Sequence, residues 1–383
     1  MLIQIITVLA WIAVPATLIA VVDDWFLRPR RQLALAPEVA RDPPFITAVY
    51  YALPVLIIAA VIRLLVSDEL DFSAVLLVIA LVTGVVWLLD VLLLRRFRAR
   101  AARAQGKDLG DIPEPGTVDY ARSFFPVAFA VLVLRAFVFE PFRIPSDSMM
   151  PTLLDGDFII VNKYAYGLRV PVLNTKIVPV GEPQRGDVVV FRYPPNPGIN
   201  YIKRLVGLPG DRVQVKDDKL IINGSPVPAL DLGLFSDGCY EGMHKASEQL
   251  GRHTHTIIFC PTPGEIGAES LPTCNRNPPR SYVCVAQQLP GMPDKGDTDV
   301  VVVPPKNYLM IGDNRDNSSD GRFWCEGDPT GRGCDAGNNV QNGRVWGFVP
   351  EANLVGKATR IWFNWDWNRK GGPDWSRIGT RIE

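Results

Sequence analysis

The sequence predicts a protein in two parts: N-terminal transmembrane helices, then a mostly β region of linked antiparallel sheets or partial barrels with an inserted second subdomain. Three observations support this. Long apolar runs lie before Pro141, and none of that length follows it. Beyond Pro141, short β-like runs alternate with turn residues. All six cysteines lie in this second part. The formal net charge is zero and no basic stripe with interleaved aromatic residues occurs, so a nucleic-acid partner is not expected.

Each of four apolar runs is near or above the length that crosses a bilayer core of about 30 Å. They are Leu2–Val22, Phe45–Val66, Phe72–Leu94 and Ser123–Phe139. The first run lacks a basic start and a small-residue cleavage site, so it is expected to be an anchor and not a cleaved signal. An interfacial position for Leu2–Val22 or Phe45–Val66 is the alternative.

The charges of the connectors predict the orientation of these helices. The connectors Asp23–Pro44 and Arg95–Tyr120 are rich in arginine, whereas the short link Ser67–Asp71 has acidic residues and no basic ones. By the positive-inside rule, both basic connectors are cytoplasmic, and the chain after Phe139 lies outside. The predicted parts are an extra hairpin (1–71), a second hairpin with a basic loop (72–140) and an outer region (141–383), into which a cysteine-containing subdomain (216–299) is inserted.

Two spacings recur between the hairpins, which suggests a duplication. A Pro–Arg pair and an Asp–Arg pair repeat as Pro54–Arg63 with Pro126–Arg135, and as Asp23–Arg28 with Asp90–Arg95. Chance similarity is the alternative, because Leu, Val and Ala dominate any such alignment.

Nine short runs of the outer region are predicted to be strands. They are Phe158–Asn162, Asp187–Arg192, Tyr201–Val206, Arg212–Val215, Lys219–Ile222, Val300–Val303, Tyr308–Ile311, Val345–Val349 and Thr359–Phe363. Turn sequences such as Asn223-Gly224 separate them. The stretch Leu230–Gly296 shows little periodicity and is expected to be irregular.

The cysteines favour disulfides over a metal site. Cys239, Cys260, Cys274, Cys284, Cys325 and Cys334 form no C-x-x-C pair, so zinc is not expected. Their even number outside the membrane suits disulfides in an oxidising compartment. The local pairs Cys325–Cys334 and Cys274–Cys284 are one possibility among several, and free thiols are the alternative.

Two interpretations of the tryptophan-rich C-terminal segment stay open. Trp362, Trp365, Trp367 and Trp375 lie near Arg369 and Lys370, which is typical of a membrane–water boundary. Alternatively, Ile361, Phe363, Trp365 and Trp367 form one core face of a strand.

Ser148, in the segment that follows the last apolar run, is the best candidate nucleophile. A serine hydroxyl needs a base that removes its proton. The three histidines, His244, His253 and His255, all fall in the irregular stretch. A Ser-His-Asp arrangement is therefore not excluded, but Lys203 lies in a better-formed motif. Strand alternation places Lys203 on the same face as Tyr201 and opposite Ile202 and Arg204.

A lysine base must be neutral, and this requires a dry, apolar site. The ordinary lysine pKa of about 10.4 leaves only a trace of neutral amine at pH 7, whereas burial lowers the pKa. Ser318 and Ser319 are candidates to orient the amine. The segment Asp313–Asp320 could also be a calcium loop, but Arg315 occupies a position that needs an oxygen ligand.

Five ordered motifs together resemble those of the bacterial type I signal peptidases, the leader peptidases that use a Ser-Lys dyad. They are Pro145-Ser-Asp-Ser-Met-Met-Pro-Thr152 with Leu154-Asp-Gly-Asp157, Arg185-Gly-Asp-Val-Val-Val-Phe191, Tyr201-Ile-Lys-Arg-Leu-Val-Gly-Leu-Pro-Gly-Asp211, Gly312-Asp-Asn-Arg-Asp-Asn-Ser-Ser-Asp320 and Trp346-Gly-Phe-Val-Pro350. The resemblance extends from about Ala80 to the C-terminus.

The resemblance implies a role for each matching residue. Ser148 matches the nucleophile and Lys203 the general base. The Ser146 hydroxyl and the Ser148 backbone N–H match the oxyanion hole, Ser318 the serine that orients the lysine, and Asp320 with Arg322 a supporting ion pair. Apolar positions that match the lining of the substrate pockets are Phe142, Ile144, Leu153, Tyr201 and Ile202. Met149 is expected to join them. No metal or cofactor is implied.

The implied reaction is removal of N-terminal signal peptides from exported preproteins, after small residues and through an acyl-enzyme. The protein is then expected in a bacterial inner membrane, with its catalytic region on the periplasmic side. Three features depart from the family pattern. Asp147 replaces a small residue between two serines and is expected to face water, Cys325–Asn342 interrupts a continuous motif, and the first two membrane segments are additional.

Two competing functions are distinguishable. A membrane-tethered module with the same fold and no catalysis would not need Ser148, Lys203 and Ser318. A self-cleaving repressor with a Ser-Lys dyad would carry a DNA-binding helix-turn-helix and no membrane spans, and the opposite pattern is present.

Overall fold

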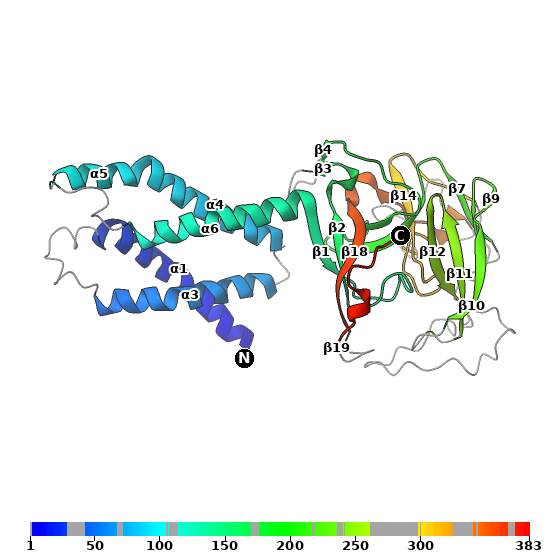
Figure 1. Cartoon of the computed structure of the whole chain (residues 1–383), viewed down its shortest axis with the longest axis horizontal. Coiled ribbons are helices and arrows are strands. Elements are labelled where there is room, and N and C mark those ends of the chain that lie inside the picture. The colour runs from blue at the N-terminus through cyan, green and yellow to red at the C-terminus, as the bar shows by residue number, and fades with distance from the viewer. Residues whose placement is uncertain are drawn as a thin grey trace. The chain divides into compact units, whose positions relative to one another are not determined.

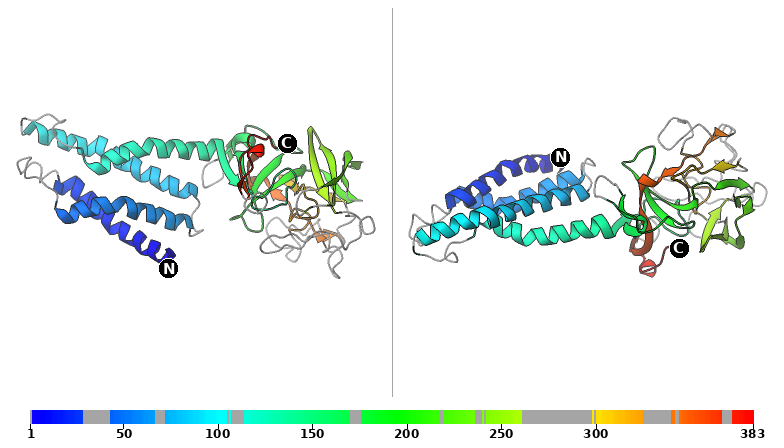
Figure 2. Two further views of the ribbon diagram at one scale, coloured as in Figure 1. Left: turned by 60° about the horizontal axis from the view of Figure 1, so that its bottom comes forward. Right: turned by 90° about the horizontal axis from the view of Figure 1, so that it is seen from above.

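The computed structural model describes residues 2–28, 43–66, 72–104, 106, 114–169, 176–216, 219–235, 240, 242–260, 298, 300–324, 340–341, 344–366 and 372–383. The chain divides into two compact units, a helical unit (1–136) and a β unit (137–383). This boundary lies close to the predicted one at residue 140. Each unit is shown from three directions (Figures 1 and 2).

Two antiparallel helix pairs build the helical unit. Helix α1 (Leu2–Val22) packs on α3 (Pro44–Val66), and α4 (Phe72–Leu89) packs on α6 (Gly116–Val133). Helix α5 (Arg95–Ala104) continues α4 and carries the basic residues of the connector. Three stretches among the described residues are long and apolar enough to span a membrane: Thr7–Leu27, Leu76–Ala104 and Gly116–Val138. The remaining predicted run, Phe45–Val66, corresponds to α3, in which a shorter apolar stretch, Pro44–Leu53, is described.

The two hairpins share a backbone distortion where the duplication hypothesis aligns them. Helix α1 ends in a π-helical turn, η1 (Asp23–Leu27), and α4 ends in another, η2 (Asp90–Leu94). Asp23 and Asp90, which begin these turns, are both buried. A third such turn, η4 (Leu134–Val138), ends α6 and has no counterpart among the described residues of α3, so the duplication stays a prediction.

The extra hairpin contacts the second hairpin at the start of α6. Helix α6 has no side-chain cap of its own, and the Asp24 carboxylate accepts hydrogen bonds from the backbone N–H groups of Gly116 (3.1 Å) and Thr117 (2.7 Å). Trp25 Nε1 donates to Thr117 Oγ1 at 2.7 Å. Because a carboxylate at a helix N-terminus satisfies otherwise unpaired N–H groups, Asp24 stabilises α6.

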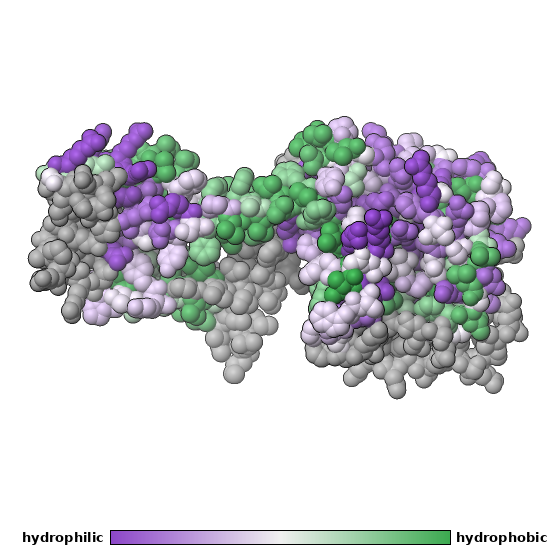
Figure 3. Space-filling model, in the orientation of Figure 1, coloured by the Kyte–Doolittle hydropathy of each residue, from purple (hydrophilic) through white to green (hydrophobic). Residues whose placement is uncertain are grey.

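The exposed surface of the helical unit separates by polarity. Apolar side chains cover α6 as a continuous band, while polar side chains gather at α5 (Figure 3). Exposed residues of α6 and the following turn include Phe124, Val127, Phe129 and Leu134. This distribution is the one expected of helices that face lipid and end in a basic connector.

An eight-stranded antiparallel sheet forms the centre of the β unit. Its order is β1 (Phe139–Arg143), β2 (Asp157–Asn162), β18 (Leu354–Asp366), β5 (Val188–Arg192), β6 (Asn200–Gly207), β14 (Asn307–Ile311) and β17 (Val349–Pro350), and β19 (Gly372–Pro373) pairs with β18. The strands predicted from the apolar runs are present, except that Val345–Val349 divides between β16 (Arg344–Val345) and β17. Strand β1 was not predicted, because it continues the last apolar run.

Strands β5 and β6 are buried on both faces, which places Lys203 inside the unit. Val189 lies opposite Lys203 in the register of these strands. Val188, Val190 and Ile202 belong to one apolar cluster, while Val189 and Phe191 belong to another, with Tyr201 packed against it. Such continuous apolar runs are typical of a strand covered on two sides.

The predicted irregular stretch Leu230–Gly296 is partly regular, so that prediction was wrong for its first part. Strands β10 (Ala229–Phe235), β11 (Met243–Leu250) and β12 (His253–Phe259) form a three-stranded antiparallel sheet. A separate four-stranded sheet has the order β13 (Val301–Val302), β7 (Arg212–Lys216), β8 (Lys219–Ile222) and β9 (Ser225–Pro226), with β13 after the three-stranded sheet in the chain and the other strands before it. The sequence did not reveal these strands, because β10 alternates exposed leucines with Asp231 and Gly233 and so lacks a buried apolar face.

Short elements complete the β unit. β3 (Leu168–Arg169) pairs with β4 (Lys176–Val178), β15 (Val340–Gln341) pairs with β16, and single helical turns lie at Tyr164–Tyr166, Glu351–Asn353 and Trp375–Arg377.

Two sequence questions receive partial answers. Cys260 is the one cysteine among the described residues; the disulfides, including the pairs Cys325–Cys334 and Cys274–Cys284, involve cysteines outside those residues and stay a prediction. Trp362 and Trp375 are 44% and 70% exposed, whereas Ile361 on the same strand as Trp362 is buried. Trp367 is outside the described residues. The exposed rings agree with the membrane-boundary alternative, which stays a prediction.

Candidate active site

Ser148 lies in a connection between β1 and β2 whose two ends are held together. Ile144 N–H donates to Asp157 O at 2.8 Å, and Gly156 N–H donates to Ile144 O at 2.9 Å. The Asp157 carboxylate, fully buried, accepts from Leu154 N–H and is paired with Arg377. These contacts hold the two ends of the segment from Ile144 to Asp157 together, so the sheet sets the position of Ser148.

The structure brings Ser148 and Lys203 into direct contact. Ser148 Oγ and Lys203 Nζ are 2.7 Å apart, and both residues are buried. The Lys203 amine also donates to Ile202 O at 2.9 Å. It lies 5.4 Å from the centre of the Tyr201 ring, on the face that strand alternation predicts. Ser146 Oγ is 3.4 Å from Ser148 Oγ.

Burial favours the neutral form of the lysine. It lowers the pKa of Lys203 from 10.5 to about 8, although the carboxylates of Asp320 and Asp313 act in the opposite direction. At that pKa, roughly a tenth of the amine is neutral at pH 7. A neutral amine within hydrogen-bond distance of a serine hydroxyl is able to accept its proton.

Gly312 allows the loop that follows β14 to approach Ser148 closely. A Cβ at position 312 would lie 2.2 Å from Ser318 Oγ and 2.5 Å from Ser148 O. Ser318 is thus packed beside the nucleophile through a position that admits only glycine. The Ser318 hydroxyl acts on the Asp320 carboxylate, whose pKa it helps to lower, and the described residues show no hydrogen bond between Ser318 Oγ and Lys203. Its orienting contact with Lys203 therefore stays a prediction.

Asn314 ties the same loop to the nucleophile segment, and its role was not predicted. Its backbone N–H donates to Ser148 O at 3.2 Å, and its side-chain Nδ2 donates to Asp147 O at 3.2 Å. Asn314 is completely buried. The only sequence signal was its place inside the Gly312–Asp320 motif, which contains several Asn and Asp residues that also suit a simple turn.

The supporting ion pair expected from the resemblance is formed. Arg322 Nε and Nη2 donate to the two carboxylate oxygens of Asp320, each at 2.8 Å, and Gly312 N–H donates to Asp320 Oδ2 at 3.0 Å. Burial alone would raise the pKa of Asp320, but the Arg322 guanidinium holds it below its ordinary value. Gly347 N–H donates to Gly321 O at 2.7 Å, so residues on the two sides of the interruption at Cys325–Asn342 lie next to each other.

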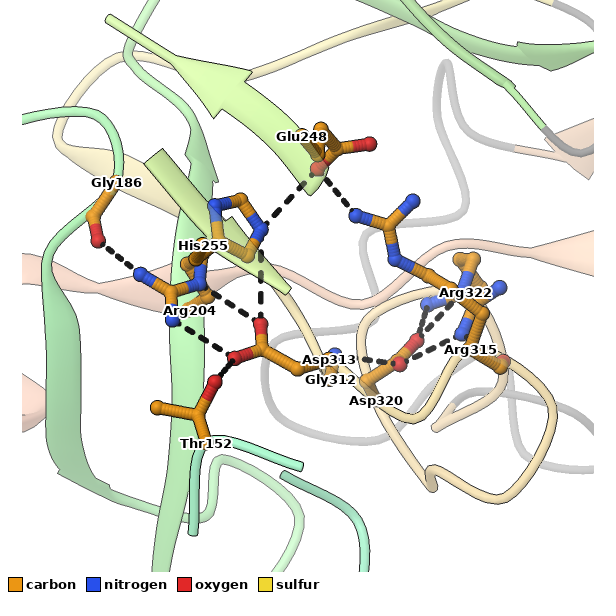
Figure 4. A network of polar contacts seen from close by, with 10 residues as sticks. All are labelled: Thr152, Gly186, Arg204, Glu248, His255, Gly312, Asp313, Arg315, Asp320 and Arg322. Atoms are coloured by element: carbon orange, nitrogen blue, oxygen red, sulfur yellow. Dashed lines mark hydrogen bonds and ion pairs between the residues drawn. The ribbon is translucent and has the colours of Figure 1, made fainter. Parts of the chain in front are cut away.

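A second buried ion pair lies beside the dyad. Arg204, adjacent to Lys203 on β6, donates to both oxygens of Asp313 at 2.7 Å and to Gly186 O at 2.7 Å (Figure 4). Burial raises the pKa of Asp313, and Arg204 more than offsets this, so that the pKa is lowered. Sequence analysis assigned no role to Arg204 or Asp313.

The predicted pocket residues divide between two apolar clusters. Ile144, Met149, Leu153 and Ile202 belong to one cluster, and Phe142 packs against it. Tyr201 packs against the other, where its ring stacks on that of Tyr193 with centres 4.3 Å apart. Met149 and Leu153 are completely buried, so they belong to the core next to the Ser148 segment. Contact with substrate stays a prediction for all six.

The expectation that Asp147 faces water was wrong. Asp147 is only 5% exposed, and its Oδ2 accepts a hydrogen bond from the Tyr240 hydroxyl at 2.9 Å. Asn317 Nδ2 donates to the same tyrosine oxygen at 2.8 Å. A buried hydroxyl partner replaces the solvent that a surface carboxylate would have, and the sequence could not reveal this because Tyr240 is far away in the chain.

No metal site is formed by the described residues. No group of three or more His, Cys, Asp or Glu among them could hold a metal ion. In the proposed calcium loop, Asp313 is paired with Arg204, Asp320 with Arg322, and Asp316 Oδ2 accepts from Cys260 N–H at 2.6 Å. Arginines and a backbone N–H occupy these oxygens, so the calcium alternative is wrong.

Comparison with known proteins gives a consistent result. Residues 117–365 match the family described as Signal peptidase, peptidase S26. Signal peptidase I of Pseudomonas aeruginosa is 40% identical over 322 residues, which cover 81% of this chain and 99% of that protein. Signal peptidase I of Haemophilus influenzae is 32% identical over 352 residues, 82% of this chain and 90% of that protein. A crystal structure of a signal peptidase I from Enterococcus faecalis covers 46% of this chain and 97% of its own at 22% identity. Its TM-score of 0.22 is too low for a structural argument.

Proposed function

Since the chain belongs to the signal peptidase S26 family, we propose that it removes signal peptides from exported preproteins with Ser148 as nucleophile and Lys203 as general base. The hydrolase class and the signal-peptide substrate follow from the family. The catalytic pair is supported by one observation above the others: the 2.7 Å contact between Ser148 Oγ and the buried Lys203 Nζ.

The first half of the proposed reaction forms an acyl-enzyme. Neutral Lys203 takes the proton from Ser148 Oγ, which attacks the scissile carbonyl carbon and forms a C–O bond. The Ser146 hydroxyl and the Ser148 backbone N–H donate to the oxygen that becomes negative, where one such donor is worth about 3–4 kcal/mol. As the C–N bond breaks, the ammonium of Lys203 returns a proton to the leaving amine.

The second half restores the enzyme. Lys203, neutral again, takes a proton from a water molecule, whose oxygen attacks the ester carbonyl on Ser148. The C–O bond to Ser148 breaks, and its oxygen regains the proton from Lys203. The signal peptide leaves with a new C-terminal carboxyl group, which releases its proton to solvent. Each step uses one proton carrier, which is why the amine must change protonation state near neutral pH.

We expect the substrate to bind as an extended strand with small side chains at the position before the scissile bond and two positions earlier. The apolar side chains around Ser148 support this. Ile144 and Ile202 belong to one apolar cluster and Phe142 packs against it, and branched or aromatic side chains of this size in a pocket wall favour small substrate side chains.

The proposed location is a bacterial inner membrane with the β unit on the periplasmic face. The basic residues of α5, which the positive-inside rule places in the cytoplasm, support this orientation. The disulfides expected from the six cysteines of the β unit would suit an oxidising compartment outside that membrane.

Cleavage of a preprotein by the detergent-solubilised full chain tests the proposal. Wild type should release the mature protein, and Ser148→Ala should release none, while its unfolding temperature stays close to that of wild type. Thr359→Ala, which removes a hydroxyl from β18 outside the site, is the control and should retain activity. Cleavage that persists in Ser148→Ala would assign the nucleophile elsewhere.

A further inference from the structure

Two segments that build the active site beside β6 are both attached to the inserted three-stranded sheet. One is the nucleophile segment, Ser146–Ser148. The other is the loop from Gly312 to Arg322, called the Gly312 loop below, which contains Ser318 and Asp320. Neither the mechanism above nor the family resemblance assigns a task to β10, β11 or β12.

Glu248 on β11 makes the strongest of these attachments. Its carboxylate lies 2.5 Å from Arg315 Nη2 in the Gly312 loop (Figure 4). Glu248 and Arg315 are 2% and 6% exposed. Burial raises the pKa of Glu248, but Arg315 and His255 lower it to about 2, so the carboxylate is charged at neutral pH. A charged pair out of reach of water is costly to break.

His255 on β12 connects this pair to the ion pair beside the dyad. His255 Nε2 lies 3.2 Å from Glu248 Oε2 and 3.8 Å from Asp313 Oδ1. Asp313 is in turn bound by Arg204, the neighbour of Lys203. As Figure 4 shows, a chain of polar contacts therefore runs from β11 and β12 to β6.

The backbone of the inserted sheet holds the Gly312 loop as well. Ile258 on β12 forms an isolated parallel bridge with Asn314, in which Ile258 N–H donates to Asp313 O (3.1 Å) and Arg315 N–H donates to Ile258 O (2.9 Å). Just beyond β12, Cys260 N–H donates to Asp316 Oδ2 at 2.6 Å.

An independent contact reaches the nucleophile segment. Tyr240, between β10 and β11, donates its hydroxyl to Asp147 and accepts from Asn317 of the Gly312 loop. Tyr240 is 2% exposed. One tyrosine thus joins the residue before the nucleophile to the loop that packs against the nucleophile.

We propose that the sheet β10–β12 is a positioning element of the active site, which acts through Glu248 and Arg315 on the Gly312 loop and through Tyr240 on the Ser146–Ser148 segment. Asn314 and Gly312 carry the effect onward, because Asn314 donates to Ser148 O and Gly312 brings Ser318 against the same backbone. A displacement of the loop moves the hydroxyl away from Lys203, and catalysis is sensitive to about 1 Å of misplacement. The inference rests on the proposed roles of Ser148 and Lys203.

Single-turnover cleavage of a fluorescent preprotein, with the full-length enzyme in excess, tests the proposal. It yields a limiting rate constant and a half-saturating enzyme concentration; a smaller active fraction of enzyme raises the second and leaves the first unchanged. In Glu248→Gln the rate constant should fall about 10- to 100-fold, because Arg315 loses its charged partner. The half-saturating concentration should stay within about twofold, since the apolar residues beneath Ser148 are untouched.

Further single variants and one double variant separate positioning from loss of folding. Glu248→Asp keeps a carboxylate and should recover part of the rate. Tyr240→Phe, which removes one hydroxyl, should lower the rate several-fold. Asp231→Asn removes a charge from an exposed position on β10 of the same sheet and should behave as wild type. In the double variant with Arg315→Met, Glu248→Gln should add nothing to the effect of Arg315→Met alone.

Two results would overturn the proposal. One is a rate constant of Glu248→Gln within twofold of wild type at an unchanged half-saturating concentration. The other is an unchanged rate constant with a raised half-saturating concentration, which would make the sheet necessary only for folding. Failure of the proposed function has a different signature. Wild type itself would then show no cleavage that depends on Ser148.

Discussion

Lys203 and Arg204 are consecutive on β6, both are buried, and their surroundings are opposite in kind. Arg204 meets a carboxylate, Asp313, with two hydrogen bonds at 2.7 Å. Lys203 meets a serine hydroxyl and a backbone carbonyl. We call these surroundings the ion-pair side and the dyad side. Burial therefore has different consequences for the two residue types: a guanidinium, which is charged in proteins with or without a partner, needs an opposite charge in contact, whereas a buried lysine amine without one tends to lose its proton.

The difference shows how one strand supports both stability and chemistry. On the ion-pair side, the cost of burying charge is offset by an opposite charge at contact distance. On the dyad side no opposite charge in contact offsets that cost. The pKa of Lys203 therefore falls, and the residue becomes a base that works near neutral pH. The two carboxylates that act on the Lys203 pKa, Asp320 and Asp313, are each held by an arginine, which limits how far they raise it.

The largest effect is expected for Lys203→Met on the dyad side. The change preserves an apolar side chain of similar length and removes the base, so kcat/KM should fall about 10³- to 10⁴-fold. The unfolding temperature should not fall, because a penalty for burying the amine disappears. Preprotein cleavage and tryptophan fluorescence during heating measure the two quantities. Retained turnover in this variant would remove Lys203 from the mechanism.

Arg204→Met, the matched change on the ion-pair side, should act mainly on stability. It leaves Asp313 buried without its cation, which costs about 3–5 kcal/mol and lowers the unfolding temperature by about 10 °C for a unit of this size. Arg204→Lys keeps the charge but cannot form the paired hydrogen bonds, so an intermediate temperature is expected. An Arg204→Met protein as heat-stable as wild type would show that the two sides do not differ in this way.

Ser146→Ala should reduce catalysis on the dyad side without altering the base. Loss of one donor to the developing oxyanion is expected to lower kcat about 10²- to 10³-fold, with little change in KM. Steady-state kinetics with a synthetic signal-peptide substrate measures both constants. The idea fails if KM rises while kcat is unchanged, because Ser146 would then contribute to binding alone.

The pH dependence should report the dyad side directly. With a Lys203 pKa of about 8, kcat/KM should rise about tenfold between pH 6 and 7 and level off above pH 8. Stability has the same sign. Between pH 8 and the ordinary lysine pKa of 10.5 the unfolded chain binds more protons than the folded one, so this residue makes folding more favourable as pH rises through that window. The penalty is fully present below pH 8. A rate profile that is flat between pH 6 and 8 would contradict the assignment.

Local patterns explain which parts of the fold were predictable. The apolar runs, the basic connector at Arg95 and most strands of the main sheet were confirmed, because hydrophobic length and alternation are visible in a short window of sequence. Strands β10 to β12 were missed because glycine, histidine and exposed leucines interrupt the alternation there. Their regularity depends on pairing with one another and on the Gly312 loop.

The candidate site divides in the same manner. Ser148 and Lys203 could be proposed from motifs whose residue types fit a serine hydrolase, and Asp320 with Arg322 lie close together in the chain. Asp147 was placed wrongly, and Arg204, Asp313, Asn314 and Glu248 had no predicted role. Each of these is defined by a partner far away in sequence: Tyr240 for Asp147, and Arg315 for Glu248.

The sequence by itself determined that a membrane-anchored chain carries a serine and a lysine in motifs of a peptidase family, because covalent order and hydrophobicity are properties of the chain alone. Only the tertiary structure decided which buried charges are paired. Among the described residues it left Lys203 without a carboxylate in contact and gave one to Arg204, and it placed an inserted sheet against the Gly312 loop and the Ser146–Ser148 segment. The energy of a buried charge depends on its neighbours within a few ångströms, and folding alone selects those neighbours.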